Sequence, residues 1–207
     1  NDRPVYSEMS LGDLVEAFAS THPVPGGGSA AALAGAVGAS LLLMVAGHPK
    51  TKSGTPEETA DVEAAAARLR PVRDSLLAFV DRDSAAYRGV MAAHKMPKGS
   101  PGEQSQRRQA IDAATRAAAE VPIDTMRACR QALLAAVSVA AKATRGAASD
   151  VGVAIELLLA ALRGARLNVE INLTALTDAE YVARMRTEAG QLADDAATAA
   201  ARARALL

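Results

Sequence analysis

The sequence is poor in aromatic side chains and has no excess of charge of either sign. Among 207 residues there is no tryptophan, with only three tyrosines and two phenylalanines. Lysine plus arginine equals aspartate plus glutamate, at 23 of each. Proteins that bind nucleic acid gather positive charge on one face, and those that bind single strands stack bases on aromatic rings. The composition therefore argues against this class, and we expect no nucleic-acid partner.

Cysteine and histidine are scarce as well. Cys129 is the only cysteine, so no disulfide can form within the chain, which fits a reducing compartment and predicts a cytoplasmic protein. Its apolar helical surroundings predict a buried, unreactive thiol. The histidines His22, His48 and His94 are scattered and lack the spacing of metal ligands. We therefore expect neither a metal nor a redox cofactor.

Half of the residues are apolar, and alanine, the best helix former, dominates that half. No run of strand-forming residues alternates with polar ones. The sequence predicts an all-α fold, a single-domain helical bundle over residues 1–207 with long kinked helices. Pro71 is expected to kink one helix, and Pro122 is expected to break or kink another. Small side chains bury little area each, so we also expect the chain to form a homodimer.

Apolar periodicity and capping residues predict where the helices lie. Residues 1–9 are expected to form an arm. The expected helices cover residues 11–20, 29–47, 55–95, 104–120, 123–145, 150–176 and 178–206. Their expected N-caps include Ser10, Ser29, Thr55, Ser149 and Thr177.

One apolar run, over residues 30–47, is long enough to cross a membrane. Most of it is alanine and glycine, whose transfer into lipid gains little free energy, and no second run of this kind exists. We interpret the run as a buried central helix and expect no membrane partner. Gly35 and Gly38 within it predict close contact with a neighbouring helix.

A glycine-rich segment, PGGGS, leads into this helix. Gly26, Gly27 and Gly28 free the backbone from side-chain clashes, and Ser29 is a favourable cap. The first amides of a helix lack internal partners and lie at its positive end, so the segment can bind an anion or a polar edge. The alternative is a tight turn that only lets helices pack closely. The lysine of a phosphate-binding loop is missing, which argues against a nucleotide.

Three polar residues interrupt the apolar side of the helix expected over residues 150–176. At 100° per residue, Asp150, Asn168 and Asn172 lie within about 40° of one another. Buried polar groups need partners, so the asparagines either line a pocket or bridge helices. Asp150 and Asn168 would lie about 27 Å apart along a straight helix. Only a long ligand or a partner subunit could join them.

Asp83 and Tyr87 form a further candidate pair. They are four residues apart and therefore share one helix face. Tyr87 is one of the few aromatic side chains able to stack on a flat ring. The alternative is a half-buried tyrosine that only packs.

Taken together, four segments resemble the cyclodeaminase/cyclohydrolase family of folate one-carbon enzymes, and they occur in the order found in that family. The segments are VPGGGSAAALAGAVGASLLLMVA (24–46), DSAAYRGVMAAHKMPK (83–98), EVPIDTMRAC (120–129) and SDVGVAIELLLAALRGARLNVEINL (149–173). The resemblance implies an all-α homodimer that binds tetrahydrofolate derivatives as substrate.

The resemblance also implies one of two reactions. A cyclohydrolase adds water to the methenyl carbon of 5,10-methenyltetrahydrofolate and opens the ring to 10-formyltetrahydrofolate. A cyclodeaminase closes formiminotetrahydrofolate to methenyltetrahydrofolate and expels ammonia. A deaminase usually works beside a transferase domain, which these residues do not include, so we expect the cyclohydrolase. A non-catalytic folate-binding protein or helical scaffold is the remaining alternative, favoured if the asparagines merely bridge helices.

The expected chemistry assigns roles to the candidate residues. A carboxylate near the cationic methenyl group would stabilise it and deprotonate the attacking water. Asp150 is the first candidate for this role and Asp83 the second. The expected substrate-binding groups are the amides of Gly26, Gly27 and Gly28 with Ser29 for a ligand carbonyl or carboxylate, Tyr87 for the ring, and Asn168 and Asn172 for the pterin edge.

Overall fold

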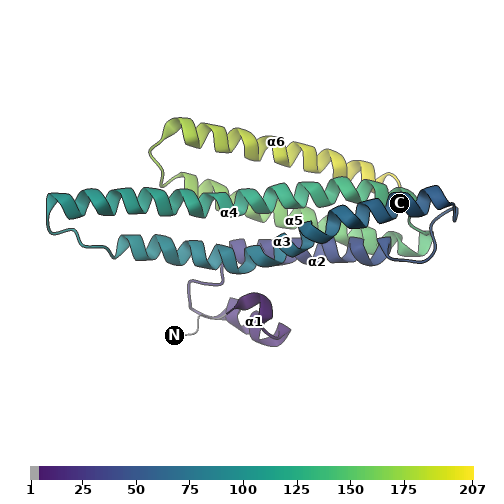
Figure 1. The fold of residues 1–207 in the computed structure, drawn as a ribbon, viewed down its shortest axis with the longest axis horizontal. Coiled ribbons are helices and arrows are strands. Elements are labelled where there is room, and N and C mark those ends of the chain that lie inside the picture. The colour runs from purple at the N-terminus through teal and green to yellow at the C-terminus, as the bar shows by residue number, and fades with distance from the viewer. Residues whose placement is uncertain (1–4) are drawn as a thin grey trace.

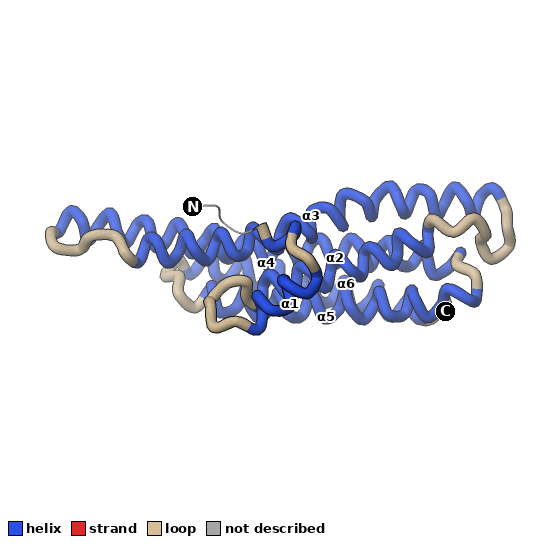
Figure 2. The backbone as a smooth tube through the Cα atoms, turned by 90° about the horizontal axis from the view of Figure 1, so that it is seen from below, coloured by secondary structure: helices blue, strands red, loops and turns tan. Residues whose placement is uncertain are grey.

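The computed structural model describes residues 5–207, which form an elongated bundle of helices (Figure 1). The long helices run side by side, and the short α1 lies below them in Figure 1 and in front of them in Figure 2. No strand occurs among the described residues, so the all-α prediction is confirmed. The α-helices are α1 (Leu11–Ala19), α2 (Gly27–Ala46), α3 (Pro56–His94), α4 (Pro101–Lys142), α5 (Ala148–Leu173) and α6 (Ala179–Arg204).

The expected N-terminal arm is held against the bundle where it is described; residues 1–4 of that arm lie outside the described part. A 3₁₀ turn, Tyr6–Glu8, begins the described segment. The carboxylate of Asp81 on α3 accepts hydrogen bonds from the backbone N–H groups of Tyr6, at 2.6 Å, and Ser7, at 3.2 Å. The hydroxyl of Tyr6 donates to the carbonyl of Val24, at 3.2 Å, which ties this turn to the start of the glycine-rich segment.

Helix α2 is packed against α3, α4 and α5, as a central helix should be. Its two internal glycines mark close approaches. A methyl group at Gly38 would lie 2.9 Å from Leu158 and 3.0 Å from the backbone oxygen of Ala154 on α5. A methyl group at Gly35 would lie 3.1 Å from the sulfur of Cys129 on α4. Both glycines therefore let neighbouring helices approach α2 closely, as predicted.

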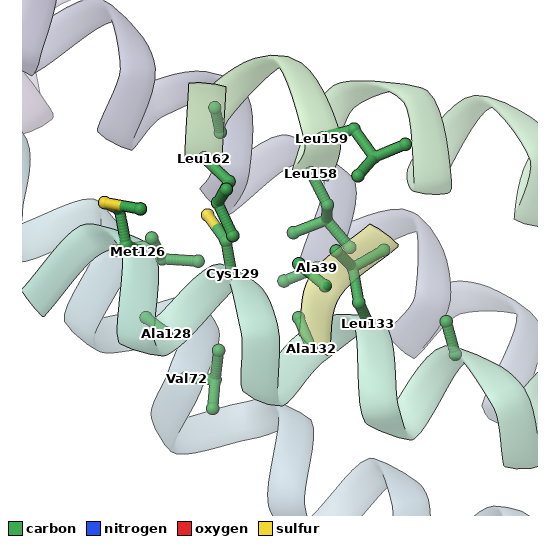
Figure 3. Close-up of a cluster of buried hydrophobic side chains, with 14 of the residues drawn as sticks. Ala39, Val72, Met126, Ala128, Cys129, Ala132, Leu133, Leu158, Leu159 and Leu162 are labelled. Atoms are coloured by element: carbon green, nitrogen blue, oxygen red, sulfur yellow. The ribbon is translucent and has the colours of Figure 1, made fainter. Parts of the chain in front are cut away.

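The core next to α2 is built from small side chains interleaved with leucines. Figure 3 shows Ala128 and Ala132 of α4 beside Val72 of α3, with Leu158 and Leu162 reaching in from α5. Cys129 lies in the same layer and is fully buried. Burial raises the pKa of its thiol to about 12, so the thiol stays protonated at neutral pH. The prediction of a buried, unreactive cysteine is confirmed.

By length and composition alone, α2 would be able to cross a bilayer. In the structure, 56% of its most apolar window is buried within the bundle. This burial agrees with the interpretation of α2 as a core helix, because its apolar side chains are occupied in packing against α3 and α5.

Some expected helix starts are confirmed and others are wrong. Ser10 and Thr55 cap α1 and α3 as predicted. Ser29, however, is not a cap, because α2 already begins at Gly27. Ser149 does not cap α5 either, since a 3₁₀ turn at Arg145–Ala147 runs directly into that helix. The last helix is capped by Asp178, whose carboxylate accepts from the N–H of Tyr181 at 3.0 Å, rather than by Thr177.

Both internal prolines lie inside continuous helices. Helix α3 runs through Pro71, and its two halves point in different directions (Figure 1). The expectation of two separate helices over residues 104–120 and 123–145 is wrong, because α4 continues through Pro122. Proline removes the backbone donor for the carbonyl four residues earlier. Here the side chain of Asn172 supplies that donor to Ala118, at 3.1 Å, which offsets part of the cost.

Candidate active site

A cavity of about 350 Å³ lies where the N-terminus of α2 meets α3, α4 and α5. The backbone of Gly26, Gly27 and Gly28 forms one wall. The polar side chains on the other walls are Asp83, Tyr87, Asn168 and Asn172. Three stretches that the sequence singled out separately therefore meet around one space.

Asp83 lies directly over the first turn of α2. A methyl group added at Gly28 would overlap the carboxylate of Asp83, so only glycine allows so close an approach. The hydroxyl of Ser29 lies within hydrogen-bond distance of this carboxylate, 3.1 Å from Oδ2. A carboxylate is favoured at this end of a helix, where unpaired N–H groups and the helix dipole meet it. The N-cap residue of α2 is Gly26, and Asp83 lies close to the turn that follows it.

Burial raises the pKa of Asp83, and the hydrogen bonds from Ser29 oppose the rise without cancelling it. Removing a carboxylate from water disfavours its charged form, and donors to that form favour it. A carboxylate whose pKa is raised toward neutrality is a stronger base than an ordinary aspartate. The environment of Asp83 therefore suits proton transfer at the cavity.

Ser29 lies behind Asp83 rather than on the cavity wall. It is fully buried, and its Oγ donates to the carbonyl of Val80, at 2.8 Å, and lies 3.1 Å from Oδ2 of Asp83. Ser84, also fully buried, lies 3.1 Å from the same hydroxyl. The two serines form a polar cluster that fixes the carboxylate from behind. Sequence reasoning assigned no role to Ser84, because its neighbour Ser29 is 55 residues away along the chain.

The two asparagines both line the cavity, and one of them also bridges helices. Nδ2 of Asn168 donates to the carbonyl of Gly164 in its own helix, at 2.9 Å. Nδ2 of Asn172 donates across to Ala118 on α4, at 3.1 Å. Asn172 therefore does both things that the sequence offered as alternatives: it lines the cavity and bridges two helices.

Tyr87 lies one helical turn beyond Asp83 and is 40% exposed. It is on the cavity wall together with Asp83, as their shared helix face predicts. More than half of the residue's surface is thus covered, and the remainder is accessible.

Asp150 is not brought to this cavity within one chain. It lies in the first turn of α5, eighteen residues before Asn168, which corresponds to about 27 Å along the helix. The carboxylate among the cavity residues is Asp83. A role for Asp150 would need a partner subunit or a long ligand, as the sequence already indicated.

A second, larger hollow of about 880 Å³ lies between α3 and α4, next to Pro71. It contains none of the residues that the sequence predicted for the site. Across residues 5–207, no three His, Cys, Asp or Glu side chains are grouped so as to hold a metal ion.

Comparison with known proteins places these features in a family. Residues 10–191 match the model of the formiminotransferase-cyclodeaminase family. A methenyltetrahydrofolate cyclohydrolase from Methylorubrum extorquens is 35% identical over 148 residues, which cover 70% of this chain and 71% of that protein.

Two further matches are to proteins named as cyclodeaminases. A formimidoyltransferase-cyclodeaminase from Gallus gallus is 36% identical over 112 residues, which are 54% of this chain but only 21% of that longer protein. The crystal structure of a formiminotetrahydrofolate cyclodeaminase from Thermotoga maritima superimposes with a TM-score of 0.86 at 26% identity. That match covers 97% of this chain and 96% of the other.

Proposed function

Because this chain belongs to the formiminotransferase-cyclodeaminase family, we propose that it hydrolyses 5,10-methenyltetrahydrofolate to 10-formyltetrahydrofolate. The observation that carries the proposal is the match to a methenyltetrahydrofolate cyclohydrolase over 70% of this chain and 71% of that protein. The bifunctional relatives, by contrast, are matched over only about a fifth of their length. In line with its lone reduced cysteine, we assign the enzyme to the cytoplasm.

Asp83 is the base in this proposal. The methenyl group carries a delocalised positive charge, which a neighbouring carboxylate stabilises. Asp83 takes a proton from the attacking water, and the new carbon–oxygen bond forms. The bond from the carbon to N5 then breaks, N5 gains a proton, and the hydroxyl proton leaves to give the formyl group. One proton is released overall, and no redox partner is needed.

The first turn of α2 and the ring of Tyr87 hold the substrate. Amides at the start of a helix have no internal acceptor, so the glycine-rich segment can donate to a carbonyl or carboxylate of the ligand. Tyr87 offers a flat surface on the same side as Asp83. The buried pair Ser29 and Ser84 keeps the carboxylate in place during the reaction.

A second candidate function is the cyclodeaminase reaction, which is favoured by the Thermotoga maritima likeness over nearly the whole chain. Two assays on one preparation separate the possibilities. Loss of the ultraviolet absorbance of methenyltetrahydrofolate reports hydrolysis, and ammonia release from formiminotetrahydrofolate reports deamination. We expect the first signal to be dominant. Ammonia release without hydrolysis would favour the deaminase, and binding without either signal would favour a non-catalytic folate-binding protein.

The pH dependence of hydrolysis should follow the ionisation of Asp83. Burial raises the pKa of this carboxyl, and only its ionised form can accept a proton from water. Activity should therefore be lost as the pH falls through that raised pKa, at a value above the ordinary 3.8. Measuring kcat/KM against pH tests this, and an acidic limb centred at or below 3.8 would contradict it.

We further infer that the working enzyme is a homodimer formed through α2 and α5. These adjacent helices expose apolar side chains, among them Val37 (45%), Met44 (50%), Val153 (52%) and Leu167 (73%). Exposed apolar patches of this kind favour association. Ile171, at the cavity edge, is 65% exposed, so a partner seated here would also border the active site.

Leu167→Asp tests the dimer. A carboxylate at the most exposed of these positions on α5 would have to be desolvated in the interface, so the variant should be monomeric while the wild type is dimeric. Sedimentation velocity of both proteins measures this. Leu134→Asp, at an exposed position on α4 outside the proposed interface, serves as the matched control and should leave the dimer intact. A monomeric wild type would refute the inference.

A further inference from the structure

Pro122 determines how one cavity side chain is oriented. Inside α4 it cannot supply the N–H that would normally reach the carbonyl of Ala118. That carbonyl accepts instead from Nδ2 of Asn172, at 3.1 Å. A carbonyl oxygen can only accept, so the NH₂ end of the Asn172 amide must face Ala118 and its oxygen end must point the other way.

The side-chain amide of Asn168 has the same orientation, with its NH₂ group toward a backbone carbonyl. Nδ2 of Asn168 donates to the carbonyl of Gly164, at 2.9 Å, and this partner is again purely an acceptor. Neither Oδ1 of Asn168 nor Oδ1 of Asn172 has a hydrogen-bond partner among residues 5–207, and both residues line the 350 Å³ cavity. The wall formed by α5 therefore offers the ligand two acceptors, one helical turn apart.

We propose that Pro122 is a positioning residue that fixes Asn172 with its oxygen toward the cavity, and that the two asparagine oxygens select a ligand edge with adjacent N–H donors. The ligand assignment rests on the proposed function. The aminopyrimidinone end of a tetrahydrofolate carries such donors, in its 2-amino group and its ring N–H groups. The carboxylate tail, which only accepts, would face two acceptors here and be repelled.

This arrangement orients the substrate as well as selecting it. With the donor edge on α5, the other side of the ring system is left to Asp83 and the start of α2, which form the remaining polar walls of the cavity. A ligand lacking the donors would leave the acceptors unpaired in a partly buried site, which is a strong basis for discrimination.

Equilibrium binding of tetrahydrofolate, which is not hydrolysed, tests the positioning role. Pro122→Ala restores the helical N–H to Ala118 and so frees the Asn172 amide to turn either way. We expect tetrahydrofolate to bind this variant about 3- to 10-fold more weakly, the loss typical of one hydrogen bond. Pro71→Ala makes the same change inside α3, beside the other hollow, and should leave the dissociation constant unchanged.

An analogue without the 2-amino group tests the selection of donors. The wild type should bind this 2-deamino compound about 10-fold more weakly than tetrahydrofolate, whereas Asn172→Ala should distinguish the two less than about 2-fold. A merely structural asparagine would weaken both ligands equally in the variant. Equal discrimination by the wild type and Asn172→Ala, or unchanged binding by Pro122→Ala, would overturn the proposal.

A readout without ligand separates this inference from the proposed function. In the wild type, the side-chain NH₂ of Asn172 should exchange its hydrogens slowly by NMR, and Pro122→Ala should accelerate that exchange, whereas Pro71→Ala should not. If the wild type fails to bind tetrahydrofolate, the proposed function and the donor-edge assignment both fall, while this exchange experiment still decides the role of Pro122. Equal exchange in all three proteins would refute that role.

Discussion

Asp83→Asn should lower kcat for hydrolysis of methenyltetrahydrofolate by about 10²- to 10⁴-fold, the usual contribution of a general base. The amide has nearly the shape of the carboxylate and can still accept the hydrogen bonds from Ser29. It carries no negative charge for the methenyl cation and cannot take up a proton from water. Steady-state kinetics measure the effect, and circular dichroism should show an unchanged helix content.

Two comparisons make this experiment decisive. Asp74→Asn changes an exposed carboxylate on the same helix and should leave turnover as in the wild type. Asp150→Asn tests the carboxylate that the sequence favoured, which lies outside the cavity of the single chain. Full activity in Asp83→Asn together with its loss in Asp150→Asn would transfer the catalytic role to Asp150.

Gly28→Ala should impair both stability and turnover, because the added methyl group overlaps the carboxylate of Asp83. Either α2 shifts or Asp83 is displaced from its place over the first turn, and forced fits of this kind cost roughly 1–3 kcal/mol. Displacement also removes the base from its hydrogen bonds with Ser29. The free energy of unfolding, measured with denaturant, and kcat/KM should therefore both decrease.

Two other glycines provide controls for Gly28→Ala. A methyl group at Gly89, on α3, meets nothing within 4 Å, so Gly89→Ala should stabilise the helix by about 1 kcal/mol without affecting turnover. At Gly27 the added methyl would lie 3.7 Å from Asn168, an ordinary contact, so Gly27→Ala should fold normally. A Gly28→Ala protein as stable and as active as the wild type would contradict the close approach of Asp83.

Much of the fold was predictable because its determinants are local. Alanine content indicated helices, the caps Ser10 and Thr55 were correct, and Gly35 and Gly38 marked close helix contacts as expected. Burial of Cys129 followed from its apolar surroundings. Each of these predictions was made from residues within a few turns of one another, which periodicity and capping rules describe well.

The wrong predictions share a different cause. Ser29 looked like a cap, but α2 begins at Gly27, and the Ser29 side chain is buried against Asp83, 54 residues away. Pro122 looked like a break, but Asn172, 54 residues from Ala118, supplies the missing donor. Both outcomes depend on contacts between helices, which no local pattern specifies.

The candidate site was partly predictable for the same reason. The glycine-rich segment, the pair Asp83 and Tyr87, and the two asparagines were each singled out by local chemistry. Only the packing of α2 against α3 and α5 brings them to one cavity and leaves Asp150 at the far end of its helix. The choice between two carboxylates therefore needed the arrangement of helices.

A crystal structure of Asp83→Asn bound to 5,10-methenyltetrahydrofolate tests most directly whether this cavity is the active site. The substituted protein should retain the substrate long enough to be observed. We expect the methenyl carbon beside residue 83 and the aminopyrimidinone edge against the oxygens of Asn168 and Asn172. Substrate bound instead in the hollow between α3 and α4, with the cavity at the start of α2 empty, would contradict the proposed site.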